Sequence, residues 1–216
     1  MAEKTLQEKK DNFSVALGLF DYINPIFYTV TSVMLALHLF SEMGLPVHCI
    51  FAIGAVLSLI FGFTIPTVKF IVGLGIMKFK MPVNLVFYVN SGIFISGLML
   101  LLTVFKPELG LFFVIVAVLV GLLVVIYLKT SQFNTIAVLT GAFGYLMIYS
   151  TMIAYSLSHG KIVSVVLYAL AICLFVMLVG IGIKADLKDA RVHWVIEISN
   201  VCCQLSVALA TILVFI

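Results

Sequence analysis

The feature that most constrains the fold is a series of seven apolar runs, each long enough to cross about 30 Å of hydrocarbon as a helix. They cover residues 15–40, 46–68, 83–105, 109–128, 133–157, 162–183 and 192–216. Since 64 % of the residues are hydrophobic and only 10 % are charged, the chain cannot build both a core and the wet surface of a soluble protein. The runs therefore predict an all-α, polytopic membrane protein with seven transmembrane helices.

The second run continues past Pro66 and Lys69 as far as Met77. Proline removes a backbone donor and bends a helix, so we expect one long kinked helix here. A lysine near the end of a span can extend its amine to the headgroups, and this is the placement that we expect for Lys69. The alternative is that Lys69 pairs with Glu197 or Asp21 across an inner cavity.

Basic residues predict the orientation, because they accumulate on the cytoplasmic side of a membrane. Of the 12 lysines and arginines, nine fall on the side of the N-terminus, two fall on the opposite side, and Lys69 lies within a run. The nine are Lys4, Lys9, Lys10, Lys78, Lys80, Lys129, Lys184, Lys188 and Arg191. We expect a multi-pass protein of the cytoplasmic membrane, with the N-terminus inside and the C-terminus outside. The net charge of +3 then reflects topology and indicates no nucleic-acid partner.

Two glycine-rich stretches suggest an internal repeat: "VGLGIMK" at 72–78 and "VGIGIKA" at 179–185. At a shift of 110 residues, Asn24 falls on Asn134 and Asn90 falls on Asn200. Asparagine is costly in hydrocarbon, so these two coincidences are more informative than matches between leucines. Chance similarity between apolar helices is the alternative explanation.

The repeat predicts two parallel three-helix units that are joined by a single linking helix. The expected parts are a cytoplasmic tail at 1–14, a first unit at 15–105, a linking helix at 106–130 and a second unit at 131–216. This 3+1+3 layout resembles that of the SWEET-type sugar carriers, which also carry asparagines on their third and seventh helices. The proline–glutamine signature of that group is missing here, since all five prolines lie in the first half of the chain.

Polar side chains gather where the first, third, fifth and seventh spans begin, at a similar depth on the side of the N-terminus. Glu197 is the acidic residue deepest in a predicted span, with His193 one turn before it and Asn200 nearly one turn after it. Such a carboxylate could exchange a proton near neutral pH or neutralise a cation, and Asp21 is a second candidate nearer the interface. A structural hydrogen bond between helices is the competing role.

Asparagines of the same layer are candidates for binding a polar solute, because each amide offers both donors and an acceptor. The candidate substrate-binding residues are Asn90, Asn200, Tyr88, Asn24 and Asn134. The candidates for proton or ion coupling are Glu197, Asp21 and His193. Interhelical hydrogen bonding is the alternative role for the asparagines.

Motifs of soluble enzymes do not occur in the chain: it has no H-E-x-x-H, G-x-S-x-G, phosphate-binding or dinucleotide-binding signature. We therefore predict no catalytic residue, metal site or cofactor, and the sequence argues against an enzyme without excluding one. The favoured function is a membrane carrier for a small polar solute, with alternating access between the two units. The alternatives are a membrane-embedded enzyme acting on a lipid or isoprenoid, and a non-catalytic membrane subunit or sensor. The expected partners are the lipid bilayer and the solute, and a second copy of the chain is a further candidate.

Overall fold

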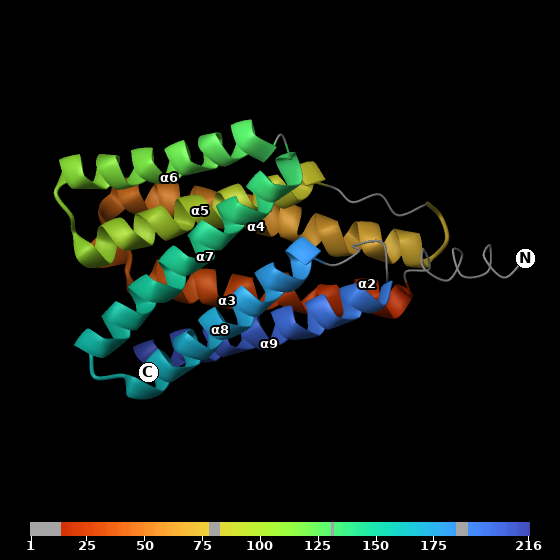
Figure 1. Ribbon diagram of the computed structural model, residues 1–216. Coiled ribbons are helices and arrows are strands. Elements are labelled where there is room, and N and C mark those ends of the chain that lie inside the picture. The colour runs from red at the N-terminus through yellow and green to blue at the C-terminus, as the bar shows by residue number, and fades with distance from the viewer. Residues whose placement is uncertain (1–13, 78–82, 131, 185–189) are drawn as a thin grey trace, which may run out of the picture.

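The computed structural model describes residues 14–77, 83–130, 132–184 and 190–216, and within these ranges all regular structure is helical (Figure 1). The helices are α2 (Val15–Asp21), α3 (Ile23–His38), α4 (Phe40–Gly73), α5 (Val83–Phe105), α6 (Leu109–Thr130), α7 (Phe133–Ser158), α8 (Ile162–Lys184) and α9 (Ala190–Phe215). The predicted tail at 1–14, except for Ser14, lies outside the described residues, as do the predicted inner basic residues at 78, 80 and 188.

Six of these helices, α4 to α9, are long and apolar enough to cross a membrane. The remaining predicted span, the first one at residues 15–40, corresponds to α2 and α3 together, which are separated at Tyr22. Pro25 explains the break, because it has no N–H to donate to the carbonyl of Asp21 four residues earlier. The protein is thus an all-α membrane protein, and its first predicted span is bent near one end.

The second predicted span is one helix with Pro66 inside it, as expected, and it ends at Gly73 rather than at Met77. Near its start, Gly44 has a φ of 65°, a backbone conformation that glycine adopts at low cost. Pro46 lies two residues later, in the first turn after this bend, where a missing N–H is tolerated.

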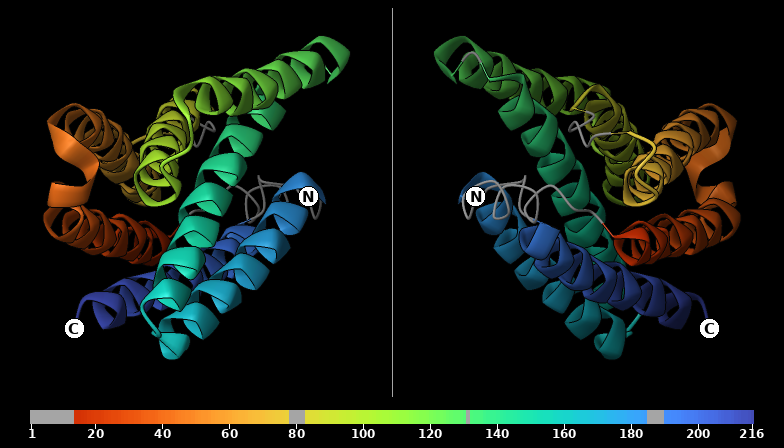
Figure 2. Two further views of the ribbon diagram at one scale, coloured as in Figure 1. Left: turned by 90° about the vertical axis from the view of Figure 1, so that its left-hand side faces the viewer. Right: turned by 90° about the vertical axis from the view of Figure 1, so that its right-hand side faces the viewer.

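Six spans form a ring in which α3, α4, α5, α7, α8 and α9 follow one another, and α9 closes the ring by packing against α3. The short α2 packs between α4 and α9. Helix α6 packs against α7 and lies on the outer side of the bundle (Figure 2).

Glycines allow close helix contacts on both faces of α5. A Cβ on Gly92 would lie 2.4 Å from the carbonyl oxygen of Gly54 in α4, and a Cβ on Gly144 of α7 would lie 2.7 Å from the backbone nitrogen of Phe94. These distances are too short for any side chain, so α4, α5 and α7 are in direct backbone contact.

Large apolar side chains fill the half of the ring that is remote from the start of α2. Among them are Leu35, Phe51, Leu100, Met152 and Tyr168, each at most 2 % exposed. In the opposite half, where the odd-numbered predicted spans begin, the interior holds most of the buried charged groups. The fold therefore has one packed end and one polar end.

Replacing Gly144 by alanine should lower the stability of the bundle by about 1–3 kcal/mol, because the new methyl group overlaps α5. The matched control is Gly121→Ala on α6, where a Cβ meets nothing within 4 Å. That control should be neutral or stabilising, by up to about 1 kcal/mol, because alanine favours a helix more than glycine does. Thermal unfolding in detergent measures both changes, and equal shifts in melting temperature would contradict the backbone contact.

Candidate functional site

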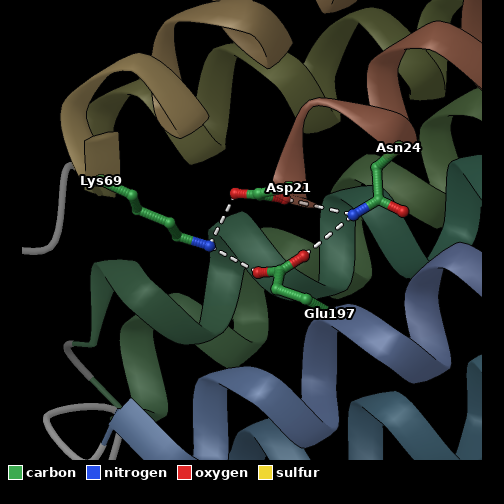
Figure 3. A network of polar contacts seen from close by, with 4 residues as sticks. All are labelled: Asp21, Asn24, Lys69 and Glu197. Carbon is green, nitrogen blue, oxygen red and sulfur yellow. Dashed lines mark hydrogen bonds and ion pairs between the residues drawn. The ribbon is translucent and has the colours of Figure 1, made fainter. Parts of the chain in front are cut away.

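A closed ring of four side chains lies at the polar end of the bundle (Figure 3). Lys69 Nζ lies 2.7 Å from Asp21 Oδ2 and 2.5 Å from Glu197 Oε1. Asn24 Nδ2 donates to the other oxygen of each carboxylate, at 3.1 Å to Asp21 Oδ1 and 2.9 Å to Glu197 Oε2. We call these four residues the ion-pair ring.

Local sequence places the members of the ion-pair ring. Asp21 ends α2 and Asn24 lies in the first turn of α3, so the bend at Tyr22 lies between them. Lys69 lies about one turn after Pro66 on α4, and Gly18 lets α2 approach so closely that a Cβ there would lie 2.6 Å from the backbone of Phe70. Glu197 comes from α9, which packs against both α2 and α3.

All four side chains of the ion-pair ring are buried, with residue exposures between 5 % and 7 %. The expectation that Lys69 extends to the headgroups is therefore wrong, and the alternative pairing, with both Asp21 and Glu197, is what the structure has. The reason is that α2 and α9 bring two carboxylates within reach of the amine. A buried ammonium is tolerated when such partners replace its water.

A partly open cavity of about 320 Å³ borders the ion-pair ring. Its wall comes from all the helices described except α6, and most of it is apolar. Besides the ion-pair ring, its main polar side chains are those of Tyr28, Asn90, Tyr145, His193, Asn200 and Gln204. Several residues of the wall are small or are prolines, among them Pro25, Gly62, Pro66, Gly141 and Ala142.

Most of the candidate residues named from the sequence lie at this cavity. Asn90 and Asn200 both line it, from α5 and α9, and so does His193, which is buried. The Asn90 side chain donates from Nδ2 to the carbonyl oxygen of Ala137 at 2.7 Å, and a Cβ on Gly141 would overlap its amide. Asp21, Asn24 and Glu197 line the cavity as members of the ion-pair ring.

Two candidates do not lie at the cavity. Tyr88 is 44 % exposed and packs its ring against Phe61, with the ring centroids 4.9 Å apart, and it is not part of the cavity wall. Asn134 lies near the start of α7, but its side chain is outside the described part of the structure.

Gln204 is a cavity residue that sequence reasoning missed. It donates from Nε2 to the Tyr145 hydroxyl at 3.2 Å, and both side chains line the cavity. A signal was present, because His193, Glu197, Asn200 and Gln204 follow one another at steps of four, three and four residues. That spacing places them on one face of a helix.

The groups at the cavity wall are of kinds that can bind a polar molecule and exchange protons. Among the described residues, no group of three or more His, Cys, Asp and Glu side chains could hold a metal ion. Two carboxylates, an ammonium group, four amides, an imidazole and tyrosine hydroxyls border a space whose wall is mostly apolar. Such a wall can orient a small molecule through a few polar contacts while excluding bulk water.

Comparison of the chain with models of protein families, with curated proteins and with solved structures gives no match. What the cavity does must therefore be argued from its own geometry.

Replacing Lys69 by methionine should destabilise the protein by about 3–5 kcal/mol, because it leaves two buried carboxylates without their cation. Lys129→Met, at the exposed end of α6, is the matched control and should be close to neutral. Adding Glu197→Gln to Lys69→Met should recover part of the loss, since one uncompensated charge disappears. Melting temperatures in detergent give this double-mutant cycle, and additive effects would show that the two groups are not coupled.

Proposed function

We propose that the protein is an integral membrane carrier for a small polar solute. The observation that supports this most directly is the cavity, which is bounded by all six spans of the ring and lies at one end of a bundle whose other end is packed. Asn90 and Asn200 contribute amide groups to it from two helices. A hollow that reaches the interior from one side and carries polar groups in its wall is what a carrier needs in one of its two alternating states.

The order of helices in the ring supports a pair of three-helix units. If the first span, α4 and α5 correspond to α7, α8 and α9, then half a turn of the ring exchanges the two units, and α6 is the linking helix outside them. In that arrangement Asn90 and Asn200 occupy equivalent positions. The units meet through α5 with α7 and through α9 with α2 and α3, so alternating access would involve movement at these two seams.

Beyond the cavity, the interior narrows to a void of about 10 Å³. This void is lined by Leu35, Phe51, Ile148, Tyr149 and Val207. Three further residues, Tyr28, Tyr145 and Gln204, line both the void and the main cavity. In a carrier, this constriction is the barrier that must open when the solute leaves on the far side.

A membrane-embedded enzyme for a lipid or isoprenoid is the second candidate. It is favoured by the position of His193, Glu197 and Asp21 at one cavity near the predicted cytoplasmic end, where acid–base groups could reach a lipid headgroup. The carrier accounts better for a cavity that all six spans of the ring enclose.

Uptake of labelled polar solutes into proteoliposomes tests the carrier. Asn90→Ala and Asn200→Ala should each lower uptake several-fold, because each removes hydrogen bonds worth about 0.5–1.5 kcal/mol. Asn84→Ala, on an exposed position of α5, is the matched control and should keep full uptake. Conversion of a lipid in detergent, with no vectorial movement in vesicles, would favour the enzyme instead.

In the proposed orientation, the cavity opens toward the cytoplasm and the N-terminus lies on the cytoplasmic side of the cell membrane. In a background without native cysteines, Ser158→Cys at the end of α7 should react with a membrane-impermeant maleimide on intact cells. Met77→Cys, after the end of α4, should react only after permeabilisation. Both positions are exposed and lie at opposite ends of the bundle, so the reverse labelling pattern would invert the orientation.

A further inference from the structure

The ion-pair ring holds more negative than positive charge. Two carboxylates share one ammonium group, which gives the three charged residues a formal charge of −1 when all are ionised. Asn24 adds two donated hydrogen bonds but no charge. In an interior of low dielectric constant, two carboxylates at one site do not both stay ionised unless further positive charge is near. The ring is therefore completed by one more monovalent positive charge.

Acceptor atoms without protein partners lie at the same wall. Asn24 Oδ1 is buried and receives no hydrogen bond, since the amide donates through Nδ2 only. The buried Tyr28 hydroxyl, which belongs to the next turn of α3, also has no hydrogen-bond partner. Both residues line the cavity. An unsatisfied amide oxygen calls for an N–H or O–H donor, and an ammonium group supplies donors together with the missing charge.

The rest of the cavity suits an organic cation rather than a bare metal ion or an anion. The aromatic residues Tyr28, Tyr145 and Phe175 line it, and the Tyr145 and Phe175 ring centroids lie 5.0 Å apart. Aromatic faces attract cations, and apolar walls favour a carbon skeleton over a hydrated ion. An anion would find Lys69 already engaged by two carboxylates.

We propose that the solute is a small organic monocation, a protonated amine with an apolar body, and that it exchanges with a proton at the Asp21–Glu197 pair. This inference rests on the proposed carrier function and specifies its substrate class. When the amine enters, the O–H bond of the protonated carboxyl breaks, the proton leaves to water on the same side, and the ammonium replaces it. Because one position accepts either charge, the carrier returns across the membrane with a proton after releasing the cation.

Other titratable groups face this position and must be separated from it. His193 and Tyr145 line the cavity from α9 and α7, Tyr28 lines it from α3, and Lys69 is part of the ion-pair ring. Among the described residues of the cavity wall, α5 and α8 contribute no acidic or basic side chain. His193 is the alternative source of a released proton near neutral pH.

Calorimetry on the purified protein in detergent tests the inference without any transport step. The probe is phenethylammonium, with phenethyl alcohol as its uncharged counterpart, phenylacetate as an anion and sodium chloride as an inorganic cation. We expect binding of phenethylammonium alone, with release of up to one proton, measured in buffers of different ionisation enthalpy. Its affinity should rise by up to about tenfold per pH unit while the carboxyl pair is protonated, because the proton competes.

Variants assign the released proton. Glu197→Gln and Asp21→Asn, which remove the same charge from different helices, should each abolish proton release and weaken binding by about tenfold or more. Glu42→Gln, an exposed carboxylate at the packed end, is the matched control and should retain both properties. His193→Gln should retain proton release, which separates the carboxyl pair from the imidazole.

The inference is overturned if phenethyl alcohol or phenylacetate binds as well as phenethylammonium, if the cation fails to bind, or if binding releases no proton. Loss of proton release in His193→Gln, with retention in both carboxyl variants, would also overturn it. Cation binding with proton release but without vesicle uptake would refute the carrier while leaving the cation site intact. Uptake of an uncharged solute without cation binding would refute the cation site and support the carrier.

Discussion

Two carboxylates sharing one lysine inside the bundle are the interaction on which the polar end depends. Hydrocarbon offers these groups no water, so each must be satisfied by the others, and Lys69 and Asn24 bridge Asp21 to Glu197 on both sides. The four residues come from α2, α3, α4 and α9, so the same contacts join the last span to the first two. At this end the helical ring is closed by charge, whereas at the other end apolar packing closes it.

The difference between the two ends follows from side-chain size. Where the interior is packed, Phe51, Leu100, Met152 and Tyr168 fill the space between the helices. Around the cavity, by contrast, several of the bordering residues are glycines or prolines, namely Pro25, Gly62, Pro66 and Gly141. The two prolines have a second effect, since Pro25 breaks the helical hydrogen bonding beside Asp21 and Pro66 lies one turn before Lys69. Two prolines of the cavity wall thus lie close in the chain to the charged residues of that wall.

Helix positions could be predicted closely because hydropathy is a local property of the chain. The expected spans 83–105 and 162–183 correspond to Val83–Phe105 and Ile162–Lys184. The depth of the polar layer was also predictable, since each residue advances a helix by about 1.5 Å. The rotation of each helix about its own axis was not predictable in this way. Tyr88 and Asn90 lie at nearly the same depth, yet two residues turn a helix by about 200°, so Asn90 lines the cavity and Tyr88 is exposed.

The sequence by itself determined that this chain is an all-helical membrane protein and that its amides and carboxylates lie at matching depths, because apolar length and helical rise depend only on the order of residues. The tertiary structure decided that Lys69 joins Asp21 and Glu197 instead of extending to the headgroups. It also decided that Asn90, Asn200 and Gln204 border one cavity. Both outcomes depend on which helices are neighbours and how each is rotated. Close contacts between backbones, such as those at Gly18, Gly92 and Gly144, help to set these, and no single span contains that information.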